Sequence, residues 1–160
     1  MDYVIRKIKE TEAHLLENFL YEAIFIPEGV KVPPKSCINS PELQVYITEF
    51  GKKKDDYALV AEINDEIVGA VWVRIMNDYG HIDDETPSFA ISLYKDYRGM
   101  GIGTALMEHM LRHLKNHKYS TTSLAVQKDN YAVKMYKKVG FSIVKELEEE
   151  YLMVCRLDNI

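Results

Sequence analysis

The chain has few cysteines, few prolines and no long apolar run. Among its 160 residues are 2 cysteines, 5 prolines and 1 tryptophan. Two cysteines are too few for a disulfide framework, and Cys155, in the apolar run 151–155, is expected to be a buried hydrophobic residue. The longest apolar stretch, 67–73, is too short to cross a membrane, and the first residues carry charge without an apolar signal segment. We therefore expect a cytoplasmic chain with no membrane partner.

Size and composition indicate one globular domain over residues 1–160. Hydrophobic residues make up 47% and charged residues 28%, which excludes a disordered or fibrous chain. A compact chain of this length buries roughly 70% of the surface that the unfolded chain exposes. Such a core needs no covalent crosslinks.

The net charge of −5 lacks the positive sign that favours nucleic-acid binding, so no nucleic-acid partner is expected. The charge is unevenly placed, however. Residues 94–140 hold nine basic and three acidic residues, which gives +6 there and −11 elsewhere. A basic segment in an acidic chain indicates an anionic ligand, with solvated helix faces as the alternative.

Residue patterns predict the element order β-α-α-β-β-β-α-β-α-β-β. Alternating apolar and polar residues indicate strands, and apolar residues three or four apart indicate helices. The expected strands are 3–8, 57–63, 67–76, 88–94, 123–126, 141–145 and 151–157. The expected helices are 11–23 with Thr11 as N-cap, 41–50, 104–117 and 130–140. The fold class is α/β (α+β mixed), with a mixed central sheet and helices on both faces.

A glycine-rich turn follows the strand expected at 88–94. It reads Arg98-Gly99-Met100-Gly101-Ile102-Gly103-Thr104. Glycines let the backbone approach a ligand closely, and the helix after them adds free N–H groups and a positive dipole end. The turn therefore suits a pyrophosphate, with a plain flexible turn as the alternative. Its G-x-G-x-G spacing matches neither the dinucleotide fingerprint nor a P-loop.

Two segments resemble the cofactor motifs of the GNAT superfamily, the acetyl-CoA-dependent N-acetyltransferases. Residues 98–103 look like its [QR]-x-x-G-x-[GA] motif. Residues 130–141 resemble its second motif, in which Asn, Ala, Tyr and a final Gly-Phe recur, with Ala132 one position early. The expected element order also matches, so the resemblance implies a GNAT-like fold over nearly the whole chain. It is weakest at 25–41.

The resemblance implies cofactor contacts for these residues. Leu93 and Tyr94 would pair through their backbone with the pantetheine arm and polarise the thioester carbonyl. Asn130 would cap its helix, contact the cofactor, or both. The backbone of the turn would bind the CoA pyrophosphate through Arg98, Gly99, Met100, Gly101, Ile102, Gly103 and Thr104.

Tyr136 is the candidate general acid. The resemblance places its hydroxyl near the cofactor sulfur, where it can protonate the departing thiolate; the alternative is a core tyrosine. Family members that acetylate protein N-termini often carry Glu where this chain has Ala125, which disfavours that acceptor class. Glu85, in the acidic loop 77–87, is the candidate base, with a solvated loop as the alternative. Such a loop would also attract a cationic amine.

The implied function is an N-acetyltransferase that moves an acetyl group from acetyl-CoA to a primary amine by direct attack in a ternary complex. The acceptor would be a small molecule or a peptide, bound between the loops 25–41 and 77–87. Three further residues are candidates for the pocket wall: Tyr21, Tyr46 and Trp72. A homodimer is compatible with this function.

Two other functions stay open: a non-catalytic acyl-CoA-binding sensor on the same fold, and a nucleotide-binding regulatory module. No metal site is expected. His109, His113 and His117 recur at four-residue spacing on one helix, but no acidic or cysteine ligand accompanies them.

Overall fold

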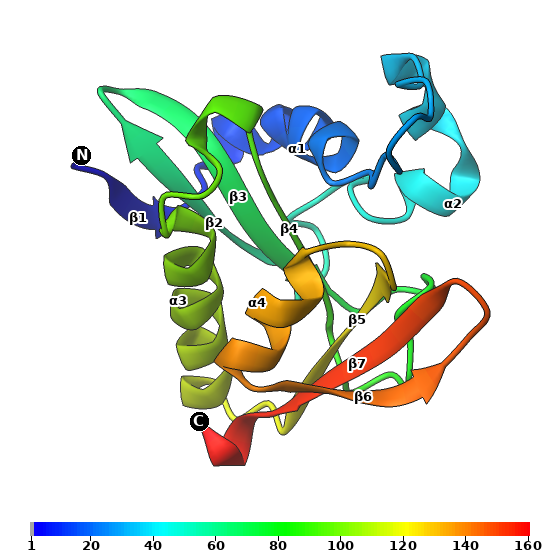
Figure 1. Cartoon of the computed structure of the whole chain (residues 1–160). Coiled ribbons are helices and arrows are strands. Elements are labelled where there is room, and N and C mark those ends of the chain that lie inside the picture. Colours follow the sequence, from blue (N-terminus) through cyan, green and yellow to red (C-terminus); the bar gives the residue numbers. More distant parts are fainter. Residues whose placement is uncertain (1) are drawn as a thin grey trace.

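One seven-stranded sheet, in the order β1-β2-β3-β4-β5-β7-β6, organises the computed structural model, which describes residues 2–160 (Figure 1). The strands are β1 (Val4–Lys7), β2 (Tyr57–Ile63), β3 (Glu66–Arg74), β4 (Ser88–Leu93), β5 (Thr121–Gln127), β6 (Phe141–Glu146) and β7 (Glu150–Arg156). Neighbouring strands are antiparallel except β4 and β5. The expected mixed sheet and element order are confirmed. Met1 lies outside the described residues.

Helices cover both faces of this sheet, as expected (Figure 1). Helices α1 (Leu16–Glu22) and α2 (Pro41–Gln44) lie on one face, and α3 (Ile102–Asn116) and α4 (Ala132–Val139) on the other. Successive side chains of a strand point to opposite faces of the sheet and so contribute to both hydrophobic cores. On β2, for example, Leu59 packs on the α3 side and its neighbour Val60 on the α1 side. None of the helices in residues 2–160 is both long and apolar enough to span a membrane.

The first helix begins differently from the expectation. A 3-10 turn (Glu10–Leu15) precedes α1, and Thr11 makes no capping hydrogen bond. Instead the Glu12 carboxylate accepts the Lys9 N–H at 2.8 Å and pairs with Arg6 at 2.8 Å. The Arg6 guanidinium holds the pKa of Glu12 low, at about 2. The Glu12 carboxylate therefore fixes the start of the 3-10 turn that leads into α1, in place of the predicted cap.

The second helix ends at Gln44, although the pattern predicted helix to residue 50. The buried Arg74 side chain on β3 explains the difference. Its Nη1 donates to the carbonyls of Val45 and Thr48, both at 3.0 Å, and so takes acceptors that a continued helix would use. Residues 45–50 become a series of tight turns held against the sheet, and Glu49 has a positive φ of 49°.

Strands β4 and β5 separate almost at once. Within the described chain their only register pair is Ser88 with Ser123. The Ser123 hydroxyl donates to the Gly80 carbonyl at 2.6 Å, and the Thr122 hydroxyl to the Pro87 carbonyl at 2.8 Å. These bonds fix the loop 77–87 at the start of β5. The two strands are therefore joined at one end, and a cavity system occupies the other.

His113 on α3 should make the fold weaken in acid. Its ring stacks on Tyr57 with a centroid distance of 3.5 Å, and burial, aided by the charges of His117 and Lys7, lowers its pKa to about 4. The unfolded chain takes up this proton near pH 6.5, so folding stability is full above that pH and falls as the pH drops toward 4. After allowance for partial exposure, we expect a loss of about 1–2 kcal/mol.

Denaturant unfolding at about pH 7.5 and about pH 4.5 measures this loss. The His113→Gln variant should lack that part of the pH difference. His109→Gln, which alters an exposed histidine of the same helix, should retain it. Equal pH differences in the wild type and His113→Gln would contradict the assignment.

Candidate active site

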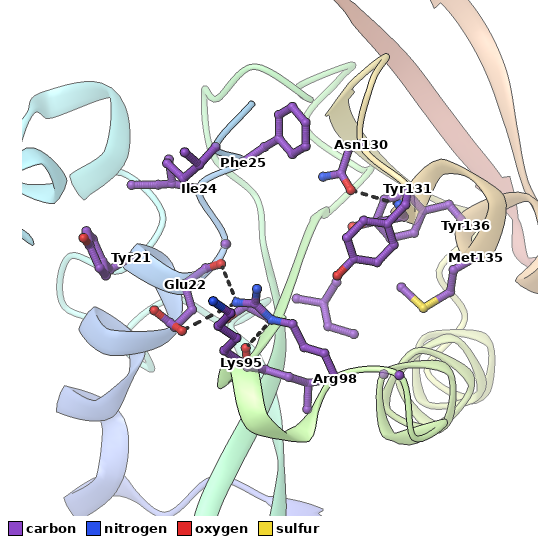
Figure 2. Close-up of a pocket in the computed structure, with 18 of the residues that line it drawn as sticks. Tyr21, Glu22, Ile24, Phe25, Lys95, Arg98, Asn130, Tyr131, Met135 and Tyr136 are labelled. Carbon is purple, nitrogen blue, oxygen red and sulfur yellow. Dashed lines mark hydrogen bonds and ion pairs between the residues drawn. The ribbon is translucent and has the colours of Figure 1, made fainter. Parts of the chain in front are cut away.

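A cleft lies at the open end between β4 and β5, formed by two adjoining cavities of about 550 and 500 Å³. The first cavity includes the glycine-rich turn, and the second includes Tyr46, Tyr79 and Glu150. Figure 2 shows the end of α1 and the segment after it on one side of the first cavity and the start of α4 on the other. Both cavities are lined by Ala23, Ile24, Phe25, Pro33, Ile91, Asn130 and Tyr136.

The backbone of β4 presents hydrogen-bonding groups to this cleft. The Tyr94 N–H donates to the Val68 carbonyl on β3 at 2.9 Å. Because an antiparallel ladder bonds its partner at alternate residues, Ile91 and Leu93 direct their N–H and C=O groups away from β3, toward the cleft. The Leu93 carbonyl accepts the Arg98 Nε–H at 2.9 Å. Leu93 thus offers its N–H, whereas the N–H of Tyr94 is already engaged.

The glycine-rich turn is open where a ligand would approach. Gly99 and Gly101 have φ values of +76° and +86°, and no atom lies within 4 Å of where their Cβ atoms would be. At Gly103 a Cβ would lie 3.4 Å from the Leu93 side chain and 3.6 Å from Met135. Glycine at these positions therefore permits both the left-handed turn and the close packing of α3.

The start of α3 supplies unpaired donors. The first helical hydrogen bond is donated by Ala105 to Gly101 at 3.1 Å, so Ile102, Gly103 and Thr104 have no helical acceptor for their N–H groups. Gly103 and Thr104 line the first cavity. Together with the positive end of the helix dipole, these groups form an anion site that fits a pyrophosphate.

Arg98 braces this turn with its side chain. Besides bonding Leu93, its guanidinium donates to the Glu22 carbonyl at 3.4 Å and pairs with the Glu22 carboxylate at 3.5 Å (Figure 2). The turn is thereby attached to both β4 and the end of α1. Lys95, at the same end of the cleft, lines the first cavity with no protein ion pair in the described part of the chain.

Asn130 and Tyr136 come from the α4 side of the cleft. The Asn130 side-chain oxygen accepts the Ala132 N–H at 2.9 Å, which caps the start of α4 while the residue also lines both cavities. The Tyr136 ring packs on Phe141 with a centroid distance of 5.9 Å. Burial raises the pKa of its hydroxyl, with a smaller contribution from Tyr131. Tyr136 is therefore a protonated donor at neutral pH, facing the cleft.

Glu85 lies outside the cleft. It is exposed in the turn before β4, where its N–H donates to the Asp83 carboxylate at 2.9 Å, and it lines neither cavity. The loop 77–87 leads into the end of β4 that is joined to β5, whereas the cleft lies at the opposite end. Its placement therefore does not support Glu85 as the base. From this loop, Tyr79 reaches the second cavity.

Sequence reasoning missed Glu150. We expected it in the turn 146–150, but it begins β7 opposite Gln127 of β5 and lines the second cavity. Two-residue spacing places Glu150, Leu152 and Val154 on the same face of the strand, and this pattern could have indicated which way Glu150 points. The register between the strands, which decides its neighbours, is not readable from sequence.

The three aromatic candidates for the pocket wall occupy different places in the structure. Tyr21 lines the first cavity and Tyr46 the second. Trp72 is completely buried, and its indole N–H donates to the Tyr46 carbonyl at 3.1 Å. Trp72 therefore supports the wall from behind and does not form its surface.

The chain is similar in sequence to known acetyltransferases. The model of the acetyltransferase (GNAT) family matches residues 27–141. The "probable N-acetyltransferase san" of Drosophila melanogaster is 35% identical over 100 residues, which are 60% of this chain and about half (52%) of that protein. An N-alpha-acetyltransferase of Sulfurisphaera tokodaii is 30% identical over 128 residues, covering 70% of this chain and 76% of that protein.

A solved structure shares the fold. The N-acetyltransferase of Thermoplasma acidophilum in complex with coenzyme A matches with a TM-score of 0.71 at 18% identity. The match covers 98% of this chain and 99% of that one.

Proposed function

Because the chain belongs to the GNAT family and is an acetyltransferase, we propose that it moves an acetyl group from acetyl-CoA to a primary amine by direct attack in a ternary complex. The supporting observation is the cleft itself, in which the cavity with the anion site adjoins a second cavity and Tyr136 lines both. In this proposal residues 1–160 form one catalytic unit.

The first cavity would hold acetyl-CoA. Its pyrophosphate would accept hydrogen bonds from the glycine-rich turn and the first N–H groups of α3, with Lys95 adding positive charge. The pantetheine arm would continue along β4 and bond the backbone of Ile91 and Leu93. Asn130, which lines both cavities, would contact the arm near its reactive end.

The reaction needs charge stabilisation and proton transfer. The amine nitrogen attacks the thioester carbon, and the Leu93 N–H donates to the carbonyl oxygen as negative charge develops there. The carbon–sulfur bond then breaks, and the Tyr136 hydroxyl gives its proton to the sulfur. The amine loses its proton to water, and Tyr136 regains one from solvent.

Neither cysteine favours a covalent enzyme intermediate. Cys155 is completely buried, and burial raises the pKa of its thiol to about 11, so it is a poor nucleophile. Cys37 lines the second cavity and is absent from the lining of the first. Direct transfer between two bound substrates is the simpler route.

Two measurements test the proposal. Calorimetric titration with acetyl-CoA should show saturable binding, and a thiol-release assay against a panel of primary amines should show amine-dependent turnover. Binding without turnover for any amine would favour the alternative of an acyl-CoA-binding sensor. Absence of acetyl-CoA binding would reject both functions.

Gly101→Ala tests the anion site. A side chain at a φ of +86° strains the turn by roughly 1–2 kcal/mol and adds a methyl group where the pyrophosphate would approach. We expect the Kd for acetyl-CoA to rise about tenfold or more. Gly51→Ala is the matched control, since Gly51 has a φ of +101°, equal free space and no place in the cleft. It should lose similar stability and keep the wild-type Kd.

A further inference from the structure

The two ends of the cleft carry different charge. Lys95 and Arg98 line the first cavity, where Glu22 pairs with Arg98. Among the described residues, Glu150 is the one charged side chain that lines the second cavity. If the anionic cofactor binds in the first cavity, Glu150 is the charged side chain that an acceptor in the second cavity would contact.

The Glu150 carboxylate has no protein partner. Within residues 2–160 it forms no ion pair and accepts no side-chain hydrogen bond, although the residue is half-buried. Nearby, Lys128 pairs with Glu146 at 3.0 Å and not with Glu150. A half-buried carboxylate without a partner is stabilised by any cation that enters the cavity.

The surroundings of Glu150 suit a cation on an apolar chain. Tyr46 and Tyr79 line the same cavity as Glu150. Burial raises the pKa of the Tyr46 hydroxyl, and the neighbouring Asp78, Tyr79 and Glu150 add to this effect. Aromatic side chains and a carboxylate that line one cavity together favour an ammonium group. Asp78 itself accepts the Ser88 hydroxyl at 2.7 Å. The rest of this cavity's lining is mainly apolar and includes Leu20, Ile24, Phe25, Leu43, Phe89 and Ile91.

A carboxylate beside the reacting amine would work against attack. It favours the protonated ammonium and raises its pKa, whereas the nucleophile must be neutral. A positive charge held by Glu150 is therefore best separated from the reacting nitrogen. We propose that the acceptor is a diamine-type molecule, with two amines joined by an apolar stretch, and that Glu150 binds the amine that does not react. This inference rests on the proposed acetyl transfer.

A matched pair of acceptors tests it: hexamethylenediamine and n-hexylamine, which have the same carbon chain and differ in the second charge. In the wild type, kcat/KM should be at least about tenfold higher for the diamine. Glu150→Gln should reduce that preference to about twofold or less, mainly through KM for the diamine, and leave KM for acetyl-CoA unchanged. Glu148→Gln removes an exposed carboxylate outside the cleft and should keep the preference.

Equal preference in the wild type and Glu150→Gln would overturn the role of Glu150. Faster turnover of n-hexylamine than of the diamine would overturn the acceptor class, while the acetyl transfer itself would stand. Calorimetric binding of hexamethylenediamine to the CoA complex gives a readout independent of turnover. Binding weakened about tenfold in Glu150→Gln supports the inference, and equal binding in both proteins contradicts it.

Discussion

Replacing Tyr136 with phenylalanine should lower kcat by about 100-fold or more and leave the Kd for acetyl-CoA within about twofold of the wild type. The change removes one hydroxyl and keeps the ring, so the edge-to-face packing on Phe141 survives. Without the hydroxyl, the thiolate must leave unprotonated or take its proton from water. Single-turnover thiol release separates this chemical step from binding.

Tyr57→Phe is the control for this experiment. Tyr57 also packs on the α3 side of the sheet, but it lies on β2 and lines neither cavity. Its loss of a hydroxyl should leave kcat unchanged. A Tyr136→Phe enzyme with wild-type kcat would remove Tyr136 from the role of acid, although the fold and the anion site would stand.

Asp56→Ala should give the largest loss of stability, about 3–5 kcal/mol, because it leaves the buried Arg74 guanidinium without its counterion. The Arg74 and Asp56 side chains are 2% and 0% exposed and share two hydrogen bonds, at 2.9 and 3.1 Å. Asp56 also accepts the Gly51 N–H at 2.9 Å. We expect Tm to fall by roughly 10 °C.

Lys128→Gln provides the comparison, since it breaks the more exposed ion pair with Glu146 and should cost less than about 1 kcal/mol. Asp56→Ala should also raise KM for the acceptor more than for acetyl-CoA. The physical reason is that Arg74 holds the turns 45–50, which carry Tyr46 in the wall of the second cavity. A loss below about 1 kcal/mol in Asp56→Ala would contradict the structural role of the pair.

The elements that could be predicted from the sequence are those whose conformation depends on residues close together in the chain. The strand expected at 57–63 and the helix expected at 104–117 from its apolar stripe match β2 and α3 to within two residues at each end. Gly99 and Gly101 marked a backbone that only glycine adopts easily, and the structure gives both a positive φ.

Long-range contacts were not readable in this way. Helix α2 ends early because Arg74, about 30 residues later in the chain, takes the carbonyls of Val45 and Thr48. The position of Glu85 outside the cleft was not readable, because it depends on which end of β4 pairs with β5. Glu150 was missed because its place in the cleft depends on the register between β5 and β7. Each outcome is decided by tertiary pairing, which local propensity does not encode.

The most direct test of acetyl transfer in a ternary complex is an initial-rate study of thiol release in which acetyl-CoA and a primary amine are varied together. Double-reciprocal plots should intersect, because both substrates occupy the cleft before the acetyl group moves. Parallel lines, or thiol release that continues without any amine, would indicate an acetylated enzyme and would contradict direct transfer.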